Sequence, residues 1–545
     1  MTWQGENFGP AIKALAMAIE PDRPALQHGD RIIDWAELDR LTDSIAAGLL
    51  KQGLKQGDVA GQMLRNSPEY LLAYFGCAKA GITPVNVNYN YRDRELADIF
   101  ARFGLKALFV NSEYVETAAR AMPEGSLDPF VAEPGNARWE ELCATETGDD
   151  FAVCDDRSAL FYMATGGTTG MPKAVMWPHQ DWWEGTGVSV WSSNPLAVPY
   201  VATSLQDHAE KAAEWTPDHP DSPAPMLLLC PLMHGTAQYS AIGHLLHGGT
   251  IVTLPGTSFD ADATIETIRD NRIRTMVMVG DAHAVPLLDA LEARADGADA
   301  IRSLRVAGSS GAIFSSANKD RFTRLHPDLL IVDVLGSSES GGGTALRLTT
   351  KDGTTGGGNF TVVPDRGITL FDDNLKEIPP GAAGVGMVAR SGPLPLGYLG
   401  EDEKNAATFP VIDGKRYLLT GDRARWAEDG SLAFIGRDNM CINTGGEKVF
   451  PEEVEAVLQH HASVRDVRVV SLPDERFGRK VVAVVQPETE REGMAELLDA
   501  CAREGLASYK VPRAYFFTQD SLRLNNGKPD YQTAQRIADE AVGSG

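Results

Sequence analysis

Apolar and polar residues follow one another along the first hundred residues in a pattern that predicts helices and strands in turn. Over residues 35–54 the apolar side chains recur at helical spacing, and this run ends at Gly57-Asp58. Residues 68–80 predict a second helix, which Gly81 closes. The other elements predicted here are a helix over 94–103 and strands over 59–64, 82–87 and 106–110. This alternation is typical of an α/β sheet with helices on its faces.

The pattern continues downstream and then changes after Arg437. Predicted strands lie at 226–230, 275–279, 304–306, 330–335, 382–390 and 417–419, with a helix at 264–271. Residues 186–225 are rich in proline and polar residues, which predicts an irregular excursion. After residue 450 we expect helices over 451–460 and 494–504 and strands over 464–471, 480–486 and 514–518. The sequence therefore predicts an α/β protein: a large N-terminal domain of helix-flanked sheets over 1–437 and a small mobile α+β domain over 438–545.

Composition and charge narrow the class of partner. The chain has 545 residues, of which 43% are hydrophobic and 23% charged, as in ordinary globular proteins of more than one domain. Its 50 basic and 75 acidic residues give a net charge of −25, which disfavours nucleic acid or an anionic membrane as partner. An anionic nucleotide would have to be held by a local basic site.

The six cysteines and the N-terminus indicate a cytoplasmic location. The cysteines are scattered, without a CxxC pair or a histidine at metal-ligand spacing, so reduced thiols are expected. Residues 1–20 lack the basic start and apolar run of a signal peptide. No apolar stretch approaches the ~20 residues that a spanning helix needs.

The strongest chemical motif is a nine-residue loop between two short apolar runs at 159–163 and 174–177. It reads Thr165-Gly166-Gly167-Thr168-Thr169-Gly170-Met171-Pro172-Lys173. Its backbone N–H groups, hydroxyls and one cation can close around phosphate oxygens. A Walker A loop is disfavoured, because Met171 and Pro172 separate Gly170 from Lys173 and a strand follows instead of a helix. A plain hairpin turn remains the alternative.

Four further residues follow predicted strands or lie next to a glycine. His234 comes after an apolar strand and before Gly235, where α/β folds place ligands, although a lone histidine is more often a core or capping residue. Asp422 follows a strand and a glycine, and its carboxylate could accept two ribose hydroxyls. Asp422 and Arg437 could equally form a surface salt bridge, and Lys528 in a late loop could be an ordinary surface lysine.

The loop over 165–173 resembles the signature loop of the adenylate-forming superfamily, which includes acyl-CoA synthetases, firefly luciferase and the adenylation domains of peptide synthetases. The family's later motifs have counterparts here in the same order. They are Pro231-x-x-His234, the turn Ser310-Gly311-Ala312, Gly336-Ser337-Ser338-Glu339, Thr420-Gly421-Asp422, Gly436-Arg437 and Gly527-Lys528. The resemblance covers nearly the whole chain and departs from the family pattern at Leu335, Asn439 and Pro529.

The resemblance implies roles for these residues. The loop Thr165, Gly166, Gly167, Thr168, Thr169, Gly170 and Lys173 would bind the ATP phosphates; Ser310, Gly311, Ala312, Gly336, Ser337, Ser338, Asp422 and Arg437 would bind the rest of ATP or AMP. Glu339, with Thr165, would hold Mg²⁺. Lys528 would reach the substrate carboxylate and the α-phosphate, and His234 would line the junction of the acyl and adenylate sites. Asn439 would be the hinge of the small domain, and Gly445, Gly446 and Glu447 would face CoA.

The implied activity is that of an acyl-CoA synthetase. A carboxylic acid would react with ATP to give acyl-AMP and pyrophosphate, and CoA would then displace AMP. Gly336 stands where acetyl-specific members carry a tryptophan, which favours a medium, long or ring-bearing acid, and residues 176–181 resemble bacterial fatty-acyl and steroid side-chain CoA ligases. Two alternatives stay open: an enzyme that loads a carrier protein, and a nucleotide-binding homologue without catalysis. A homodimer is also left open.

Overall fold

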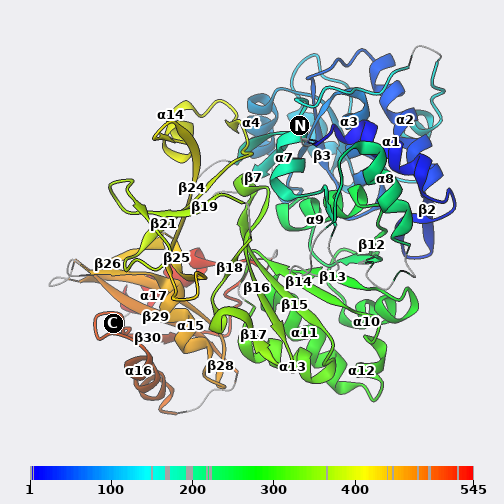
Figure 1. The fold of residues 1–545 in the computed structure, drawn as a ribbon. Coiled ribbons are helices and arrows are strands. Elements are labelled where there is room, and N and C mark those ends of the chain that lie inside the picture. Colours follow the sequence, from blue (N-terminus) through cyan, green and yellow to red (C-terminus); the bar gives the residue numbers. More distant parts are fainter. Residues whose placement is uncertain are drawn as a thin grey trace.

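The computed structural model describes most of the 545 residues. The exceptions are residues 1, 2, 4, 92, 149–150, 166–171, 192–199, 217–218, 220–221, 223, 313, 364–365, 438–439, 445–446, 475–477, 489–491, 525–526 and 544–545. Figure 1 shows the chain running from a large part (blue to yellow) into a smaller part (orange to red) beside it.

The first sheet of the large part has seven strands in the order β22-β8-β7-β4-β3-β5-β6. Their bounds are β3 (Val59–Met63), β4 (Thr83–Asn86), β5 (Leu105–Val110), β6 (Phe130–Val131), β7 (Leu160–Thr165), β8 (Lys173–Pro178) and β22 (Gly397–Tyr398). The strands from β3 to β7 run parallel, whereas β8 and β22 are antiparallel additions at one edge. The carboxyl ends of the parallel strands therefore lie on the side where the β7–β8 hairpin turns.

The second sheet has ten strands in the order β17-β16-β15-β14-β13-β11-β12-β1-β2, with β18 also paired to β16. Their bounds are β1 (Pro24–His28), β2 (Arg31–Asp34), β11 (Met226–Leu228), β12 (Ile251–Thr253), β13 (Thr275–Met278), β14 (Val306–Ser310), β15 (Leu330–Ser337), β16 (Gly342–Thr350), β17 (Gly353–Thr354) and β18 (Thr361–Val362). The strands from β1 to β15 along this order are parallel, while β2 and β16 to β18 are antiparallel.

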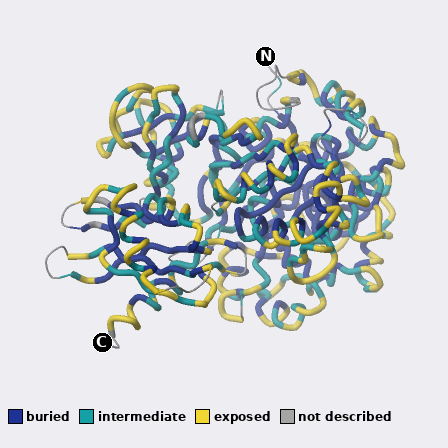
Figure 2. The backbone as a smooth tube through the Cα atoms, turned by 90° about the horizontal axis from the view of Figure 1, so that it is seen from below, coloured by how far each residue is buried: buried dark blue, intermediate teal, exposed yellow. Residues whose placement is uncertain are grey.

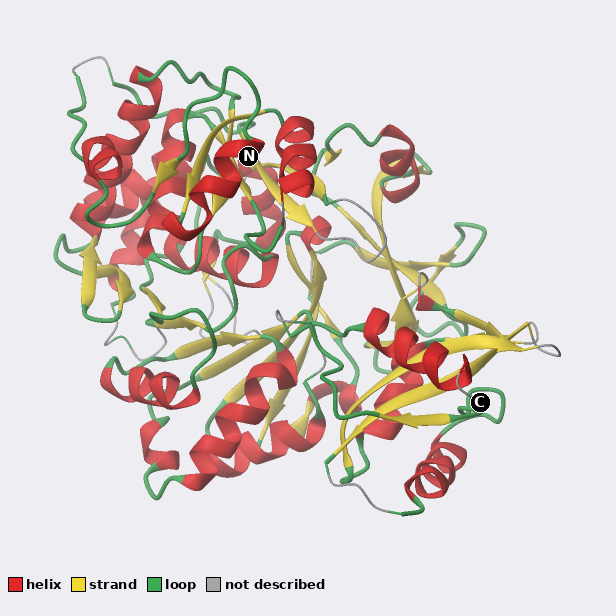
Figure 3. Ribbon diagram, turned by 180° about the vertical axis from the view of Figure 1, so that it is seen from behind, coloured by secondary structure: helices red, strands yellow, loops and turns green. Residues whose placement is uncertain are grey.

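Helices lie between the two sheets and on their outer faces (Figure 3). In β11, Met226 and Leu228 belong to the central core, whereas Leu227 faces the outer core, as the two-residue period of a strand requires. The central core is built on α1 (Phe8–Ala18), α2 (Trp35–Lys51), α3 (Pro68–Ala80), α6 (Ala137–Cys143), α7 (His179–Thr186), α8 (Leu205–Glu214) and α9 (Gly235–Leu246). The outer helices are α4 (Asp93–Phe103) and α5 (Val115–Ala121) on the first sheet, and α10 (Ala261–Asp270), α11 (Gly280–Ala293), α12 (Gly297–Ala300) and α13 (Ser316–Leu325) on the second.

A third, six-stranded sheet leads from the large part to the small one. Its order is β20-β19-β21-β24-β23, with β25 also paired to β24. The bounds are β19 (Ile368–Phe371), β20 (Glu377–Ile378), β21 (Gly386–Ser391), β23 (Val411–Ile412), β24 (Lys415–Trp426) and β25 (Leu432–Arg437), and α14 (Asp402–Thr408) precedes β23. The last residue of β25 is Arg437, so the chain enters the small part directly from this sheet.

The small C-terminal part is an α+β unit with its own apolar cores. Strands β28 (Val464–Asp474), β29 (Gly478–Pro487) and β30 (Tyr515–Phe517) form a sheet, and β26 (Ile442–Thr444) pairs with β27 (Glu447–Val449). One face of the sheet packs on α15 (Pro451–Gln459) and α16 (Met494–Gly505), and the other on α17 (Tyr531–Gly543). Figure 2 shows buried segments in both parts. The α/β class with a small C-terminal α+β domain is confirmed.

Two sequence-based expectations were wrong in detail. Residues 186–225 contain the amphipathic helix α8, capped by Ser204, as well as the short strands β9 (Val190–Trp191) and β10 (Tyr200–Val201). Because prolines flank this run on both sides, the sequence pattern did not predict the helix between them. Asp422 lies inside the twelve-residue strand β24 and not after a strand, because β24 continues through Gly421 and pairs with β25.

Candidate functional site

The β7–β8 hairpin brings the two ends of the predicted phosphate loop face to face. Thr165 and Lys173 are directly opposite each other in the antiparallel register. The predicted phosphate-binding residues Gly166, Gly167, Thr168, Thr169 and Gly170 lie outside the described residues. Asn86, at the end of β4, fixes the base of the hairpin: its Oδ1 accepts the Ala164 N–H at 2.7 Å, and its Nδ2 donates to the Ala164 and Met233 carbonyls at 3.0 and 2.6 Å. Asn86 thus ties the hairpin to the loop that carries His234.

Lys173 lies in a group of cations. The ammonium groups of Lys173 and Lys404 are both 5.7 Å from the centre of the Tyr398 ring. Burial lowers the pKa of Lys173, and Lys404 lowers it further. Arg102 donates to the Pro172 carbonyl at 3.4 Å and pairs with Glu401 at 2.7 Å. This arrangement of three cations with one acid is suited to an anion with several charges.

Glu339 lies in a 3₁₀ turn, Ser338–Ser340, which follows β15. Three aromatic side chains fix this turn: Tyr398 donates its hydroxyl to Glu339 Oε1 at 2.8 Å, and Trp177 Nε1 and the Tyr239 hydroxyl both donate to the Ser338 carbonyl at 2.9 Å. Ser337 caps the turn by accepting the Ser340 N–H. The Tyr398 ring thus faces the cations while its hydroxyl holds the carboxylate.

Gly336, just before this turn, is required by backbone packing. A Cβ there would lie 2.3 Å from the Gly342 carbonyl oxygen in the neighbouring strand. Gly341, just after it, faces the Trp177 and Trp182 rings, and a Cβ would lie 2.9 Å from the former and 3.2 Å from the latter. Buried aromatic rings therefore lie close behind the Glu339 turn.

The turn after β14, residues 310–312, brings its backbone to the edge of the candidate site. Ser310 donates its hydroxyl to the Val334 carbonyl at 3.1 Å, so it joins β14 to β15 at their carboxyl ends. Gly311 adopts a positive φ of 82°, close to Thr236 of α9, and Ala312 packs on the central core. The predicted Ser310–Ala312 turn lies beside the start of α9, next to His234.

His234 is the N-cap residue of α9 and ends the loop that joins β11 to this helix, so it does not follow the strand directly. Burial lowers its pKa to about 4, and Lys528 acts in the same direction. Its Nε2 is buried and has no hydrogen-bond partner among the described residues. His234 is therefore a neutral imidazole at physiological pH, beside the lysine of the small domain.

Asp422 and Arg437 form a cross-strand pair between β24 and β25. Arg437 Nε lies 3.0 Å from Asp422 Oδ1. Burial raises the pKa of Asp422 and the guanidinium opposes this, while Asp422 raises the pKa of Arg437. The salt bridge that the sequence left open is present, and its carboxylate is buried, unlike that of a surface pair.

Lys528 reaches the same place from the far end of the chain. Burial of its ammonium group is the largest cause that lowers the pKa of Lys528, although the residue as a whole is exposed. Repulsion by Arg437 lowers this pKa further, and attraction to Glu339 acts against it. Gly527 packs on the large part, where a Cβ would lie 2.7 Å from Ala282 Cβ and 3.3 Å from Val279 Cγ1. His234, Glu339, Arg437 and Lys528 therefore surround one point.

A carboxylate that the sequence analysis missed also faces this point. Glu452, in the first turn of α15, has its pKa raised to about 6 by burial, with Arg437 opposing and Asp422 reinforcing the shift. Its Oε2 has no hydrogen-bond partner among the described residues. Acids in a first helical turn are common, so nothing in the sequence marked this one.

The residues expected on the CoA side are less fully described. Asn439, Gly445 and Gly446 lie outside the described residues, and Glu447 is exposed on β27, opposite Thr444. No group of three or more His, Cys, Asp or Glu side chains that could hold a metal occurs among the described residues. A carboxylate on Glu339 and a hydroxyl on Thr165 are oxygen donors, which suit Mg²⁺, an ion usually held by one or two carboxylates together with substrate phosphates.

The fold and the site define a two-part α/β protein that gathers cations around Tyr398 and brings a lysine from its small part to a carboxylate in its large part. Family models match the chain accordingly: "AMP-binding enzyme" over residues 15–399 and "AMP-binding enzyme C-terminal domain" over residues 453–528. The chain belongs to this adenylate-forming superfamily and is an enzyme of its AMP-forming acid–CoA ligase family.

Curated relatives and solved structures agree with this assignment. A 3-oxocholest-4-en-26-oate–CoA ligase of Rhodococcus rhodochrous is 37% identical, with 97% of this chain and 96% of the relative covered. A medium/long-chain-fatty-acid–CoA/3-oxocholest-4-en-26-oate–CoA ligase of Mycolicibacterium smegmatis is 36% identical, with 95% and 94% covered. A benzoate CoA ligase structure from Burkholderia xenovorans superposes with a TM-score of 0.80 at 19% identity, with 97% and 99% covered, and so supports the fold.

No helix among the described residues has the length and apolar character needed to cross a bilayer. The homodimer and the cytoplasmic location stay predictions.

Proposed function

We propose that this protein is an acyl-CoA synthetase that activates a medium- or long-chain fatty acid, an aromatic acid or a steroid side-chain acid. It would use ATP to form acyl-AMP and pyrophosphate, and then CoA to form acyl-CoA and AMP. The observation that carries the proposal is the convergence of Lys528 with Glu339, Arg437 and His234. Three of these residues follow or end strands of the large part, and Lys528 comes from the small part.

In the first step the substrate carboxylate attacks the α-phosphorus of ATP. The bond to the β-phosphate oxygen breaks, and pyrophosphate leaves. Negative charge grows on the α-phosphate oxygens, so a cation directed at them stabilises the transition state. Lys528 would supply this charge, and Lys173 and Lys404 would hold the leaving pyrophosphate, since both lie over Tyr398.

The other site residues would hold the nucleotide and the metal. Asp422 and Arg437 would contact the ribose, and the Ser310–Ala312 turn and residues 336–338 would line the rest of the adenylate. Mg²⁺ bound by Glu339 and Thr165 would supply further positive charge to the phosphates. Tyr398 would keep the Glu339 carboxylate in place through its hydrogen bond of 2.8 Å.

The second step needs another arrangement of the small domain. CoA has to reach the acyl carbonyl carbon, where its sulfur forms a bond while the bond to AMP breaks. Lys528 would stand in the way, so residues 438–545 would turn about Asn439 and bring Gly445, Gly446 and Glu447 toward CoA. The separate cores of the small domain support its movement as one body.

Two observations support the proposed class of carboxylic acid substrate. The relatives above are named for fatty acids and a steroid side-chain acid. The rings of Trp177, Trp182 and Tyr239 are buried behind the Glu339 turn, so the interior next to this turn is apolar. An apolar acid suits such surroundings better than a charged one.

The test is an assay of purified protein with ATP, Mg²⁺ and a panel of fatty, aromatic and steroid acids, with and without CoA. We expect pyrophosphate release with an apolar acid, and a thioester once CoA is added. Pyrophosphate without any thioester would favour an enzyme that loads a carrier protein. No reaction with any acid would favour the non-catalytic homologue.

Lys528→Ala tests the central role in the same assay. It should abolish acyl-AMP formation but leave thioester formation from supplied acyl-AMP largely intact, since Lys528 acts only in the first step. Equal loss in both half-reactions would contradict the role given to Lys528.

A further inference from the structure

Lys528 stands at the end of a tight hairpin whose base is anchored in the small domain. Leu522 is fully buried in the core beside α17, and the Asp530 N–H donates to its carbonyl at 2.9 Å. At the tip, the Gly527 N–H donates to the Leu524 carbonyl at 2.8 Å, and the Leu524 N–H to the Lys528 carbonyl at 2.9 Å. These bonds set the shape of the hairpin but not its direction relative to the sheet.

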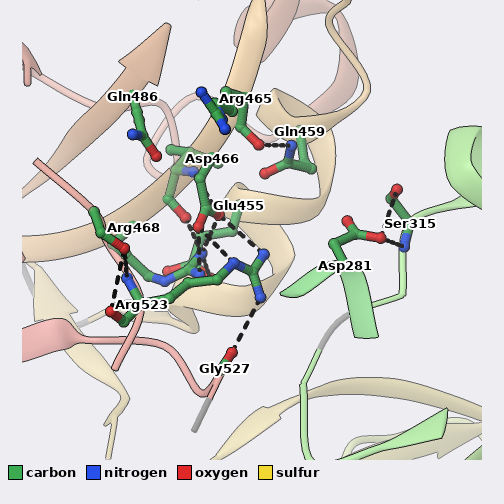
Figure 4. A network of polar contacts seen from close by, with 12 residues as sticks. Asp281, Ser315, Glu455, Gln459, Arg465, Asp466, Arg468, Gln486, Arg523 and Gly527 are labelled. Atoms are coloured by element: carbon green, nitrogen blue, oxygen red, sulfur yellow. Dashed lines mark hydrogen bonds and ion pairs between the residues drawn. The ribbon is translucent and has the colours of Figure 1, made fainter. Parts of the chain in front are cut away.

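Arg523 supplies that direction (Figure 4). Its Nε lies 2.8 Å from Asp466 Oδ2, its Nη2 donates to Asp466 Oδ1 at 3.3 Å, and its Nη1 donates to the Gly527 carbonyl at 3.3 Å. One planar guanidinium therefore joins β28 to the peptide group that precedes Lys528. A guanidinium can do this because its donors point in fixed directions.

Asp466 is itself held firmly. It is 3% exposed, and Arg468 binds it through Nη1 at 2.9 Å and Nη2 at 3.1 Å. The buried Glu455 lies next in this row and accepts the Val469 N–H at 2.8 Å, with the Arg468 guanidinium 3.9 Å away. Acids and bases alternate from α15 through β28 to the hairpin, so Arg523 is attached to a rigid part of the small domain.

We propose that Arg523 is a positioning residue for the acyl-AMP-forming step, acting through Lys528. The Gly527 carbonyl and the Lys528 nitrogen share one planar peptide group, so fixing the oxygen fixes the plane from which the Lys528 side chain starts. Val279 and Ala282 of the large part lie against Gly527 nearby. Displacement of a reacting group by ~1 Å costs on the order of 100-fold in rate, so a loosened turn should slow this step.

The inference rests on the proposed function, because it needs Lys528 to act in the first half-reaction. A purely structural role for Arg523 would lower stability and slow both half-reactions together. A positioning role would slow only the step that uses Lys528. Arg523→Lys separates these roles further, since a single ammonium can pair with Asp466 but cannot reproduce the fork that also reaches the Gly527 carbonyl.

The experiment compares Arg523→Ala and Arg523→Lys with a control, Arg536→Ala. Arg536 is an exposed arginine of α17 in the same domain, and it pairs with Glu540 at 3.1 Å. For each variant we would measure single-turnover acyl-AMP formation, thioester formation from supplied acyl-AMP, KM for ATP and the thermal unfolding midpoint. Lys528→Ala is run in parallel.

For Arg523→Lys we expect an unfolding midpoint close to wild type and acyl-AMP formation about 10- to 100-fold slower, with KM for ATP and thioester formation nearly unchanged. Arg523→Ala should slow acyl-AMP formation at least as much as Arg523→Lys does. Arg536→Ala should form acyl-AMP at the wild-type rate. The inference is overturned if both half-reactions slow equally, or if Arg523→Lys forms acyl-AMP at the wild-type rate while Lys528→Ala does not. If Lys528→Ala itself keeps the first step, the proposed function of Lys528 fails instead.

Discussion

At the scale of single residues, Lys528 is the residue whose surroundings matter most. Its ammonium group is partly buried, and Arg437 repels it while Glu339 attracts it. Both burial and Arg437 favour the neutral amine, so its pKa lies below the usual 10.5. The charge that the first step needs is therefore present below this lowered pKa and is lost as the pH rises through it.

We accordingly expect kcat/KM for ATP in acyl-AMP formation to fall on the alkaline side at a pH below 10.5, since this parameter reports groups of the free enzyme. Competitive acetylation of Lys528 over a pH series, followed by mass spectrometry with a model lysine compound as internal standard, measures the same pKa directly. A midpoint at or above that of the standard would contradict the prediction. His234, with its pKa near 4, should not contribute to the profile between pH 6 and 9.

Residues within sequence motifs could be predicted from the sequence, whereas residues that support them through contacts distant in the chain could not. His234, Glu339, Asp422, Arg437 and Lys528 lie in short recognisable contexts, and the structure gathers them. Asn86, Tyr398 and Glu452 were missed, because each acts through a hydrogen bond or burial that depends on a partner far away in the chain. A lone asparagine or tyrosine at the end of a strand has no sequence signature of its own.

At the scale of elements, the hairpin that carries Lys528 belongs to the small part and contacts the large part at Gly527. Gly527 has φ +78° and lies against Ala282 of α11. Gly493, also at φ +78° in the small domain, has no heavy atom within 4 Å of the place of its Cβ. The two glycines share the backbone requirement, but Gly493 is the N-cap residue of α16 and has open space around it, whereas Gly527 lies against α11.

Gly527→Ala and Gly493→Ala therefore form a matched pair. Each should lose about 1 kcal/mol of stability from the left-handed backbone. Only Gly527→Ala should also slow acyl-AMP formation, by at least tenfold, because its methyl group pushes the hairpin off α11. Denaturant unfolding measures the loss of stability, and single-turnover assays measure acyl-AMP formation. Equal activity of the two variants would contradict a role for the contact between Gly527 and α11 in this step.

The elements themselves were predicted well where their periodicity was clear. The helix over 68–80 has the expected bounds, with Pro68 at its start and Gly81 at its end, and both strands of the phosphate-loop hairpin are present. The helix α8 and the length of β24 were missed. In the first case proline-rich flanks concealed a short amphipathic run, and in the second a glycine inside a strand suggested an end.

At the scale of the whole molecule, the two parts meet beside Lys528, in the arrangement that the proposed first half-reaction would need. Besides Gly527 on α11, Ser316 Oγ of the large part lies 3.2 Å from His460 Nε2 of the small part, and both side chains are exposed. If the small domain must turn for the second half-reaction, a covalent link between the Ser316 and His460 positions should leave acyl-AMP formation intact and block thioester formation.

A Ser316→Cys/His460→Cys variant joined by a short reducible bis-thiol linker tests this. We expect the linked protein to keep acyl-AMP formation and to lose thioester formation, and dithiothreitol to restore it. The two single-cysteine variants, treated in the same way, control for modification of the partly exposed native cysteines. Unimpaired thioester formation by the linked protein would argue against the rotation.

The aromatic residues behind the Glu339 turn have a consequence for how such a protein can diversify. Trp177, Trp182 and Tyr239 all belong to the large part, whereas Lys528, which we propose promotes acyl-AMP formation, lies on a hairpin of the small part. Substitutions in the large part could therefore change which acid is accepted without altering the Lys528 hairpin, provided that Trp177 and Tyr239 keep their hydrogen bonds to the Ser338 carbonyl, because these bonds fix the turn that carries Glu339. Duplicated genes could in this way acquire new substrates while the small domain stays the same.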